Sequence, residues 1–157
     1  MYERVLVPLD GSEIAEAILP FAEKLAGPVD AEAMLVRVIE PLSAGEAFAA
    51  GGVVAPDTLF LRQLEAKEYL ARVERRLANK GIRVRTDLRS GTPAAEIVAA
   101  ATSWGADLIA MATHGRGGLG RLLFGSVAEA VLRAAPVPVL MIRTTAKVSV
   151  PAGEAQL

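Results

Sequence analysis

The chain lacks cysteine, an excess of charge of either sign, and any long hydrophobic run. The absence of cysteine excludes disulfides, thiolate catalysis and cysteine-ligated metal. With 17 basic and 18 acidic residues the net charge is −1, which lacks the electrostatic signature of a nucleic-acid or anionic-membrane partner. No apolar run approaches the roughly 18 residues that span a bilayer, and the N-terminus does not read as a signal peptide. We expect a cytoplasmic protein that binds neither nucleic acid nor membrane.

The size and apolar content of the chain are typical of one compact domain. It has 157 residues, of which 52% are hydrophobic, and no long linker divides it. A chain of this length can bury a full core. The last residues mix Lys, Ser, Pro, Gly and Gln, a composition typical of a frayed end. We therefore expect a domain over residues 1–144 and a flexible tail over residues 145–157.

Short apolar segments alternate with segments of helical periodicity. Five apolar segments predict strands: Val5–Leu9, Ala33–Ile39, Ile82–Leu88, Leu108–Ala112 and Val137–Ile142. Four helices are predicted between them: three begin near Ser12, Thr92 and Gly125, and the other is marked by an apolar stripe from Leu61 to Leu77. Gly81 is expected to end the second helix, and the fourth stops before Pro136. This order predicts an α/β fold, a single-domain open parallel sheet with helices on both faces.

The most informative segment is the glycine-dense loop after the fourth predicted strand. A glycine-rich turn that leads into a helix N-terminus at Gly125 and Ser126 is typical of a phosphate site. The stretch Gly115–Gly120 matches the dinucleotide spacing G-x-G-x-x-G, but the segment Pro136–Thr145 has no acidic residue to hold a ribose. A P-loop is excluded, because Arg and Leu follow Gly120 where Lys and Ser/Thr are required.

A third glycine pattern fits a longer stretch of the chain. The pattern resembles the G-x-x-G-x9-G-[S/T] signature of the ATP-binding branch of the universal stress proteins: it reads Ala112-x-x-Gly115, then nine residues, then Gly125-Ser126. The likeness continues into Arg4–Ser12 and Ser126–Ile142, and covers essentially residues 1–144. It implies strand order 3-2-1-4-5, an adenine nucleotide alpha hydrolase-like fold, and ATP as ligand, with ADP or AMP as alternatives. Mg²⁺ or Mn²⁺ would be held through the phosphates.

The resemblance also implies which residues bind the nucleotide. Asp10 aligns with the nucleoside-binding Asp of the family, Pro8 and Leu9 would shape the adenine wall, and the backbone of Val38 would contact adenine. Phosphate and ribose contacts carry over to Gly115, Gly125, Ser126 and Val127. Residue type alone favours an Asp10 that serves only the N-terminus of the first helix, and the family resemblance reverses that order. Ser126 could equally be a helix cap, and the capping and ligand roles can coexist.

Ala112 departs from the family pattern, which has glycine at this position. If the backbone φ were positive, alanine would cost about 1 kcal/mol or more. If φ is negative, the amide stays usable and only the closeness of approach suffers. We predict weaker ATP binding or a preference for a smaller nucleotide, and the hypothesis that Ala112→Gly tightens ATP binding tests this.

Evidence for catalysis is thin. His114 is the single histidine and lies inside the loop, without an identifiable nucleophile, second carboxylate or metal partner. Arg116 and Arg121 could approach the outer phosphates, although loop arginines are usually solvated. No general base, activated nucleophile or metal-binding carboxylate pair is recognisable, so we assign no catalytic residue and no protein-held metal.

Two further segments carry expectations. Residues 41–56 lack clear periodicity and are expected to be a mobile flap near the nucleotide, or an ordinary disordered insertion. The strand Val137–Ile142 is apolar and would lie at a sheet edge, which the family uses for homodimerisation, so we expect a two-fold dimer through it. Pro138 is alternatively a device that blunts this edge.

These observations favour a dimeric module that binds ATP and reports stress to an unknown protein partner. A slow ATPase or phosphotransferase that uses His114 and the loop arginines is one alternative. A nucleotide-free dimerisation adaptor is another, and the retention of Gly115 and Gly125-Ser126 argues against it.

Overall fold

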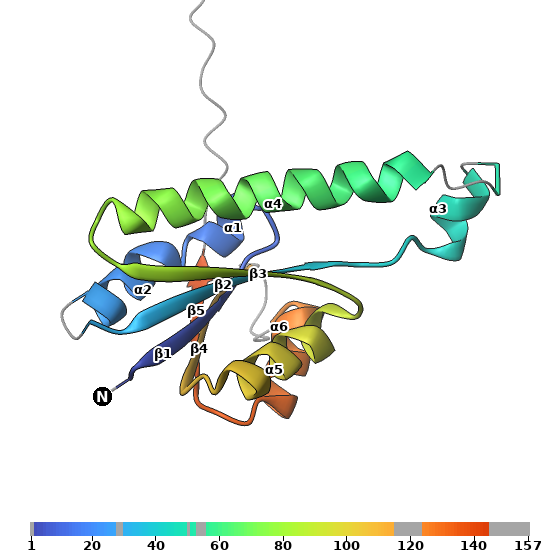
Figure 1. Cartoon of the computed structure of the whole chain (residues 1–157). Coiled ribbons are helices and arrows are strands. Elements are labelled where there is room, and N and C mark those ends of the chain that lie inside the picture. The colour runs from blue at the N-terminus through green and yellow to red at the C-terminus, as the bar shows by residue number, and fades with distance from the viewer. Residues whose placement is uncertain (1, 28–29, 50, 53–55, 115–123, 145–157) are drawn as a thin grey trace, which may run out of the picture.

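The computed structural model describes residues 2–27, 30–49, 51–52, 56–114 and 124–144 (Figure 1). Its elements in chain order are β1 (Arg4–Pro8), α1 (Glu13–Glu16), α2 (Leu19–Ala26), β2 (Glu32–Ile39), α3 (Ala44–Ala49), α4 (Pro56–Ala78), β3 (Arg83–Ser90), α5 (Pro93–Trp104), β4 (Leu108–His114), α6 (Ser126–Ala134) and β5 (Val139–Thr144). All strand pairs are parallel, and the sheet order is β3-β2-β1-β4-β5. The predicted fold class and strand order are confirmed.

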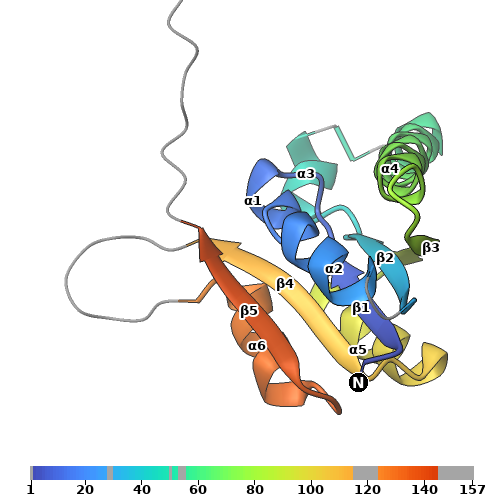
Figure 2. The same cartoon turned by 90° about the vertical axis from the view of Figure 1, so that its left-hand side faces the viewer.

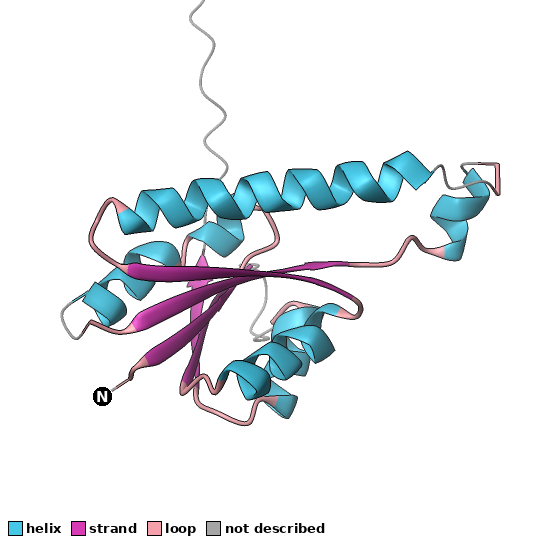
Figure 3. Cartoon of the chain, viewed as in Figure 1, coloured by secondary structure: helices cyan, strands magenta, loops and turns pink. Residues whose placement is uncertain are grey.

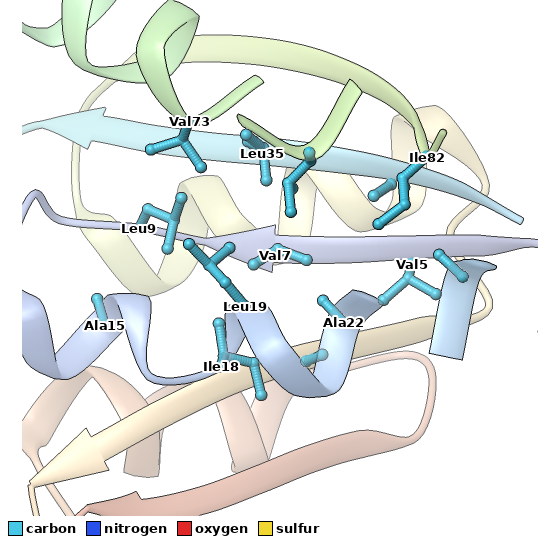
Figure 4. Packing of buried hydrophobic residues seen from close by; sticks show 14 of the residues in the cluster. Val5, Val7, Leu9, Ala15, Ile18, Leu19, Ala22, Leu35, Val73 and Ile82 are labelled. Atoms are coloured by element: carbon cyan, nitrogen blue, oxygen red, sulfur yellow. The ribbon is translucent and has the colours of Figure 1, made fainter. Parts of the chain in front are cut away.

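Helices cover both faces of the sheet, as predicted (Figure 3). On one face α1, α2 and α4 pack on alternate strand residues, among them Val5, Val7 and Leu35 (Figure 4). On the other face α5 and α6 pack on the intervening residues, such as Leu6, Val36 and Ile109. Because the central strands are buried on both sides, they read as continuous apolar runs in the sequence.

The first predicted helix is divided into α1 and α2. The N–H of Ala17 bonds to the carbonyls of Ile14 and Ala15, which closes α1 after one turn. Pro20 then lies in the first turn of α2, where its missing N–H costs no helical hydrogen bond. The expectation of one continuous helix was wrong, because Pro20 in the middle of such a helix would have removed a backbone hydrogen bond.

The expectation that residues 41–56 form a connection without helical structure was wrong. The short helix α3 occupies Ala44–Ala49, and α4 begins at Pro56, before the apolar stripe that starts at Leu61. Ser43 and Glu46 form a reciprocal capping box: the Ser43 N–H donates to Glu46 Oε2 at 2.8 Å, and the Glu46 N–H donates to Ser43 Oγ at 3.2 Å. The Ser43 N–H and the Ser43 hydroxyl, which donates to the same Glu46 oxygen at 2.9 Å, hold the pKa of the Glu46 carboxyl below its usual range.

The other boundaries differ by a few residues. Helix α4 ends at Ala78, and Gly81 with φ +81° makes the turn into β3. Strand β5 begins at Val139, two residues after the predicted start at Val137. Thr92 is the N-cap of α5 as expected, but its side chain makes no capping hydrogen bond. Within the described residues no helix is both long and apolar enough to span a bilayer. The expected tail, residues 145–157, lies outside the described residues.

Candidate functional site

A cavity of about 660 Å³ opens at the carboxyl ends of β1, β2 and β4. This volume is within the range of small-molecule sites, and the position is the one where open α/β sheets bind ligands. The cavity gathers the predicted site residues that are described: Pro8, Leu9, Asp10, Val38, Ala112, Gly125, Ser126 and Val127. Gly115 lies outside the described residues, as do Arg116 and Arg121.

Asp10 performs the structural role that residue type alone predicted, and it also faces the cavity. Its Oδ1 accepts the N–H of Ser12 at 2.8 Å, and Ser12 Oγ caps α1 by accepting the N–H of Ala15 at 3.1 Å. Among the described residues no group donates to Asp10 Oδ2. Because Asp10 is exposed and lines the cavity, one carboxylate oxygen can order the helix while the other meets a ligand.

The opposite end of the cavity is built by β4 and α6. Thr113 is buried, and its Oγ1 accepts the N–H of Gly125 at 3.2 Å, which ties the end of β4 to the start of α6. The N-cap of α6 is Gly125, so Ser126 is the first helical residue and leaves the side-chain capping role unfilled. The N-terminus of α6 therefore presents amides and the exposed Ser126 hydroxyl toward the cavity.

Glycine at position 125 is not required by the protein's own backbone. Its φ is −60°, which any residue adopts, and an added Cβ would lie 3.7 Å from Thr113 Oγ1, an ordinary contact distance. The missing side chain instead leaves space on the cavity side of the helix end. This vacancy is what close approach of a ligand to backbone amides needs.

Ala112 is unstrained in its place on β4. Among the described non-glycine residues only Asp30 has a positive φ, at 55°. Alanine at position 112 therefore costs no backbone strain, and the strained alternative considered for this position is excluded. What remains is the second alternative, in which the methyl group of Ala112 limits how closely a ligand approaches β4.

The two ends of the cavity differ in charge. Asp10, Glu40 and Glu65 line the end beneath α4, together with Arg37 and Arg62, whereas the other end has the positive dipole end of α6. His114, the single histidine, also lines the cavity and is exposed. Within the described part of the chain, no three His, Asp or Glu side chains are grouped so that they could hold a metal ion. Metal held through ligand phosphates stays a prediction.

Several cavity residues were missed in the sequence. Arg62 and Glu65 come from α4, and Arg37 from β2. Their spacing on α4 places Arg62 and Glu65 on one helix face, which the sequence could have indicated. Nothing in the sequence indicates that this face overhangs the end of β2, because that depends on how far α4 extends toward its N-terminus.

A second, polar cavity of about 440 Å³ adjoins the first on the α4 side. The guanidinium of Arg37 lies 5.1 Å from the ring centroid of Tyr69, and that of Arg72 lies 5.6 Å from the same centroid. Burial, and then the neighbouring charge of Glu16, raise the pKa of the Tyr69 hydroxyl far above its usual range. These contacts hold Arg37 against Gly11, next to the site.

The sheet order, the cavity at the strand ends and the open helix N-terminus define an α/β protein of the adenine nucleotide alpha hydrolase-like fold. The chain belongs to the Universal stress protein family, whose model matches residues 1–143. Universal stress protein MJ0531 of Methanocaldococcus jannaschii is 34% identical over 147 residues, which are 94% of this chain and 85% of that protein.

Solved structures agree with this assignment. The structure of MJ0577 from the same organism has a TM-score of 0.73 and 30% identity, and the match covers 92% of this chain and 97% of that chain. More distant is a universal stress protein in complex with cAMP, with a TM-score of 0.63, 22% identity, and coverage of 92% and 98%. A universal stress protein of Archaeoglobus fulgidus in complex with dAMP has a TM-score of 0.63, 24% identity, and coverage of 90% and 98%.

Proposed function

We propose that this chain binds an adenine nucleotide in the main cavity, with ATP as the ligand and ADP or AMP as alternatives. The observation that carries the proposal is the meeting of Asp10, Val38, Ala112 and Ser126, which come from distant parts of the chain, around one ligand-sized space. The fold is compatible with this ligand class, because relatives that share it are complexed with cAMP and dAMP.

Charge orients the nucleotide in the cavity. Phosphates favour the end at Gly125 and Ser126, where the amides of α6 and its dipole attract anions. The base favours the opposite end, where Asp10 and the backbone of Val38 line the cavity and carboxylates would repel phosphate. Mg²⁺ or Mn²⁺ would be held by the phosphates, with no protein carboxylate pair required.

In this proposal the protein is a cytoplasmic stress-response sensor that acts as a homodimer. Nucleotide binding would report the energy state of the cell to a protein partner of unknown identity. The dimer would form through β5, the edge strand that follows β4 in the sheet. Pairing of two such edges about a two-fold axis would leave the cavity of each copy open, because no described residue of β5 lines it.

Calorimetric titration of nucleotide-stripped protein with ATP, with and without Mg²⁺, tests the proposal. We expect saturable micromolar binding at one site per chain, strengthened by Mg²⁺. Asp10→Asn should weaken binding about tenfold, because a charge-assisted hydrogen bond to the ligand is lost. Ser126→Ala should weaken it several-fold, whereas Ser90→Ala, an exposed serine outside the cavity, is the matched control. Absence of ATP binding would refute the proposal and favour the nucleotide-free adaptor.

The same preparation tests whether Ala112 limits the site. Since φ at this residue is not positive, Ala112→Gly changes only the space available to the ligand. Tighter ATP binding by this variant is the expected result. Unchanged or weaker affinity would remove the Ala112 methyl group from the explanation.

Weak hydrolysis is the second candidate, and the position of His114 at the cavity is what favours it. Metal-dependent release of phosphate from ATP, abolished by His114→Ala with ATP affinity retained, would assign this activity. Binding without turnover would leave the sensor as the function.

A further inference from the structure

Helix α4 brings two charged side chains to the main cavity. The helix spans Pro56–Ala78 and lies across the face of the sheet (Figure 1), and its N-terminal half contributes Arg62 and Glu65 to the cavity lining. Residues three apart on a helix lie on the same face. Asp10 lines the same cavity, and it lines the adjoining polar cavity together with Glu65.

Arg62 has an unused donor at this place. Its Nη1 is buried and has no hydrogen-bond partner among the described residues. Buried donors are nearly always paired, because an unpaired one loses its hydration without compensation. The guanidinium has donors only, so the missing partner must be an acceptor, and a bound ligand is able to supply it.

Phosphate is a poor match for that acceptor, because the carboxylates of Asp10, Glu40 and Glu65 outnumber the guanidinium groups of Arg37 and Arg62 at this end of the cavity. The excess negative charge disfavours an anion here, whereas the N-terminus of α6 at the other end attracts one. A neutral base with a ring nitrogen acceptor fits the end beneath α4 better. Glu65 and Asp10 are then available to accept from an amino group on the base.

Adenine has this pattern on its edge, an acceptor ring nitrogen beside a donor amino group. In hypoxanthine the amino group is replaced by a carbonyl and the adjacent ring nitrogen carries hydrogen, so donor and acceptor are exchanged. We infer that Arg62 and Glu65 form a base-reading pair that selects adenine over 6-oxo purines, the arginine donating to a ring nitrogen and the glutamate accepting from the amino group. This inference rests on the proposed adenine-nucleotide function.

Comparison of ATP with ITP tests the inference, because the two nucleotides share their ribose and phosphates and differ at this edge. We expect wild-type protein to bind ATP at least about tenfold more tightly than ITP, since a mismatched edge leaves polar groups unpaired. Arg62→Gln and Glu65→Gln should each weaken the binding of ATP more than the binding of ITP. Each variant should therefore reduce the ratio of the ATP affinity to the ITP affinity. Arg75→Gln and Glu74→Gln, on the same helix but outside both cavities, are the matched controls and should leave the ratio unchanged.

The outcomes separate this inference from the function on which it rests. Equal binding of ATP and ITP by the wild type, or an unchanged ratio in both cavity variants, would overturn the base-reading pair and leave nucleotide binding intact. Failure of the wild type to bind either nucleotide would overturn both. Thermal melting of each variant verifies that it is folded, and Arg62→Lys, which keeps the charge but loses the planar guanidinium, should give an intermediate ratio if the pair reads the base.

Discussion

The two edges of the sheet are opposite in chemistry. Strands β3 and β5 lie at the two edges of the sheet (Figure 2). Strand β3 carries Arg83, Arg85 and Arg89, whereas β5 reads Val-Leu-Met-Ile over residues 139–142 before its first charge. Each β3 arginine is in an ion pair: Arg83 with Asp30, Arg85 with Glu32, and Arg89 with both Asp87 and Glu96. The four apolar residues of β5 are all partly exposed.

This difference indicates which edge is open to another chain. Charged side chains on an edge strand oppose strand pairing, and β3 has them along its length. On β5 the N–H of Ile109 bonds to the carbonyl of Pro138, so parallel geometry turns the backbone groups of Val139 and Met141 outward. Pro138 precedes β5 and accepts within the ladder, so it does not remove a donor from that strand.

A charge introduced on edge strand β5 should have the largest effect, which is a loss of dimer association. Met141→Lys places a cation among the residues proposed to pair, while its long stem can still pack on the sheet. We expect the dissociation constant of the dimer to rise about a hundredfold or more, because an unpaired charge at an interface centre is costly. Sedimentation over a concentration series measures this. The control is Thr86→Lys on β3, which should leave association unchanged. A wild-type monomer at all concentrations would contradict the premise.

Making β3 resemble β5 should have the next largest effect. The double variant Arg83→Val, Arg85→Val removes two exposed cations from β3 and leaves residues 83–85 of this edge strand apolar. We expect association beyond the dimer, visible as larger species in light scattering as concentration rises. A size distribution identical to that of the wild type would show that the β3 charges do not protect this edge.

Single ion pairs on β3 should contribute little to the free energy of unfolding, and the contributions should differ from one pair to another. The Glu32 side chain is 19% exposed beside Arg85, whereas the Asp30 side chain is 81% exposed beside Arg83. We expect Arg85→Gln to lower the free energy of unfolding by ~0.5–1 kcal/mol and Arg83→Gln to change it by close to zero. Urea unfolding at low and high salt measures both. Equal losses would mean that burial of the carboxylate does not set the value.

Nucleotide affinity should be the property least sensitive to the edges. Because no described residue of β5 lines the main cavity, the Met141→Lys monomer should bind ATP within about twofold of the wild type. The calorimetric titration described above measures this. A large loss of affinity would mean that the partner copy completes the site.

The sequence predicted the elements that local patterns specify. The strands were located within a few residues, since buried parallel strands leave continuous apolar runs. The break between α1 and α2 was missed although Pro20 marks it, and α3 was missed although Ser43 and Glu46 have the spacing of a capping box. The strand order came from the family resemblance, because periodicity does not specify which strands are neighbours.

The site residues also divide into those that sequence motifs located and those that only the fold revealed. Motif similarity located Asp10, Gly125 and Ser126, because a motif keeps its spacing along the chain. Residue type alone favoured an Asp10 that serves the first helix, whereas the motif favoured a ligand-facing one, and the folded chain has the carboxylate in position for both. Arg62 and Glu65 belong to no motif and were missed.

Periodicity and motif spacing depend on neighbours along the chain, so the alternation of strands and helices, the apolar β5 and the glycine pattern could be recognised without coordinates. Only the tertiary structure decided three features: the sign of φ at Ala112, the hydrogen bond from the Gly125 N–H to Thr113 Oγ1, and the position of α4 over the cavity. These features depend on contacts between segments far apart in the chain, and whether a buried donor such as Arg62 Nη1 is paired depends on everything packed around it.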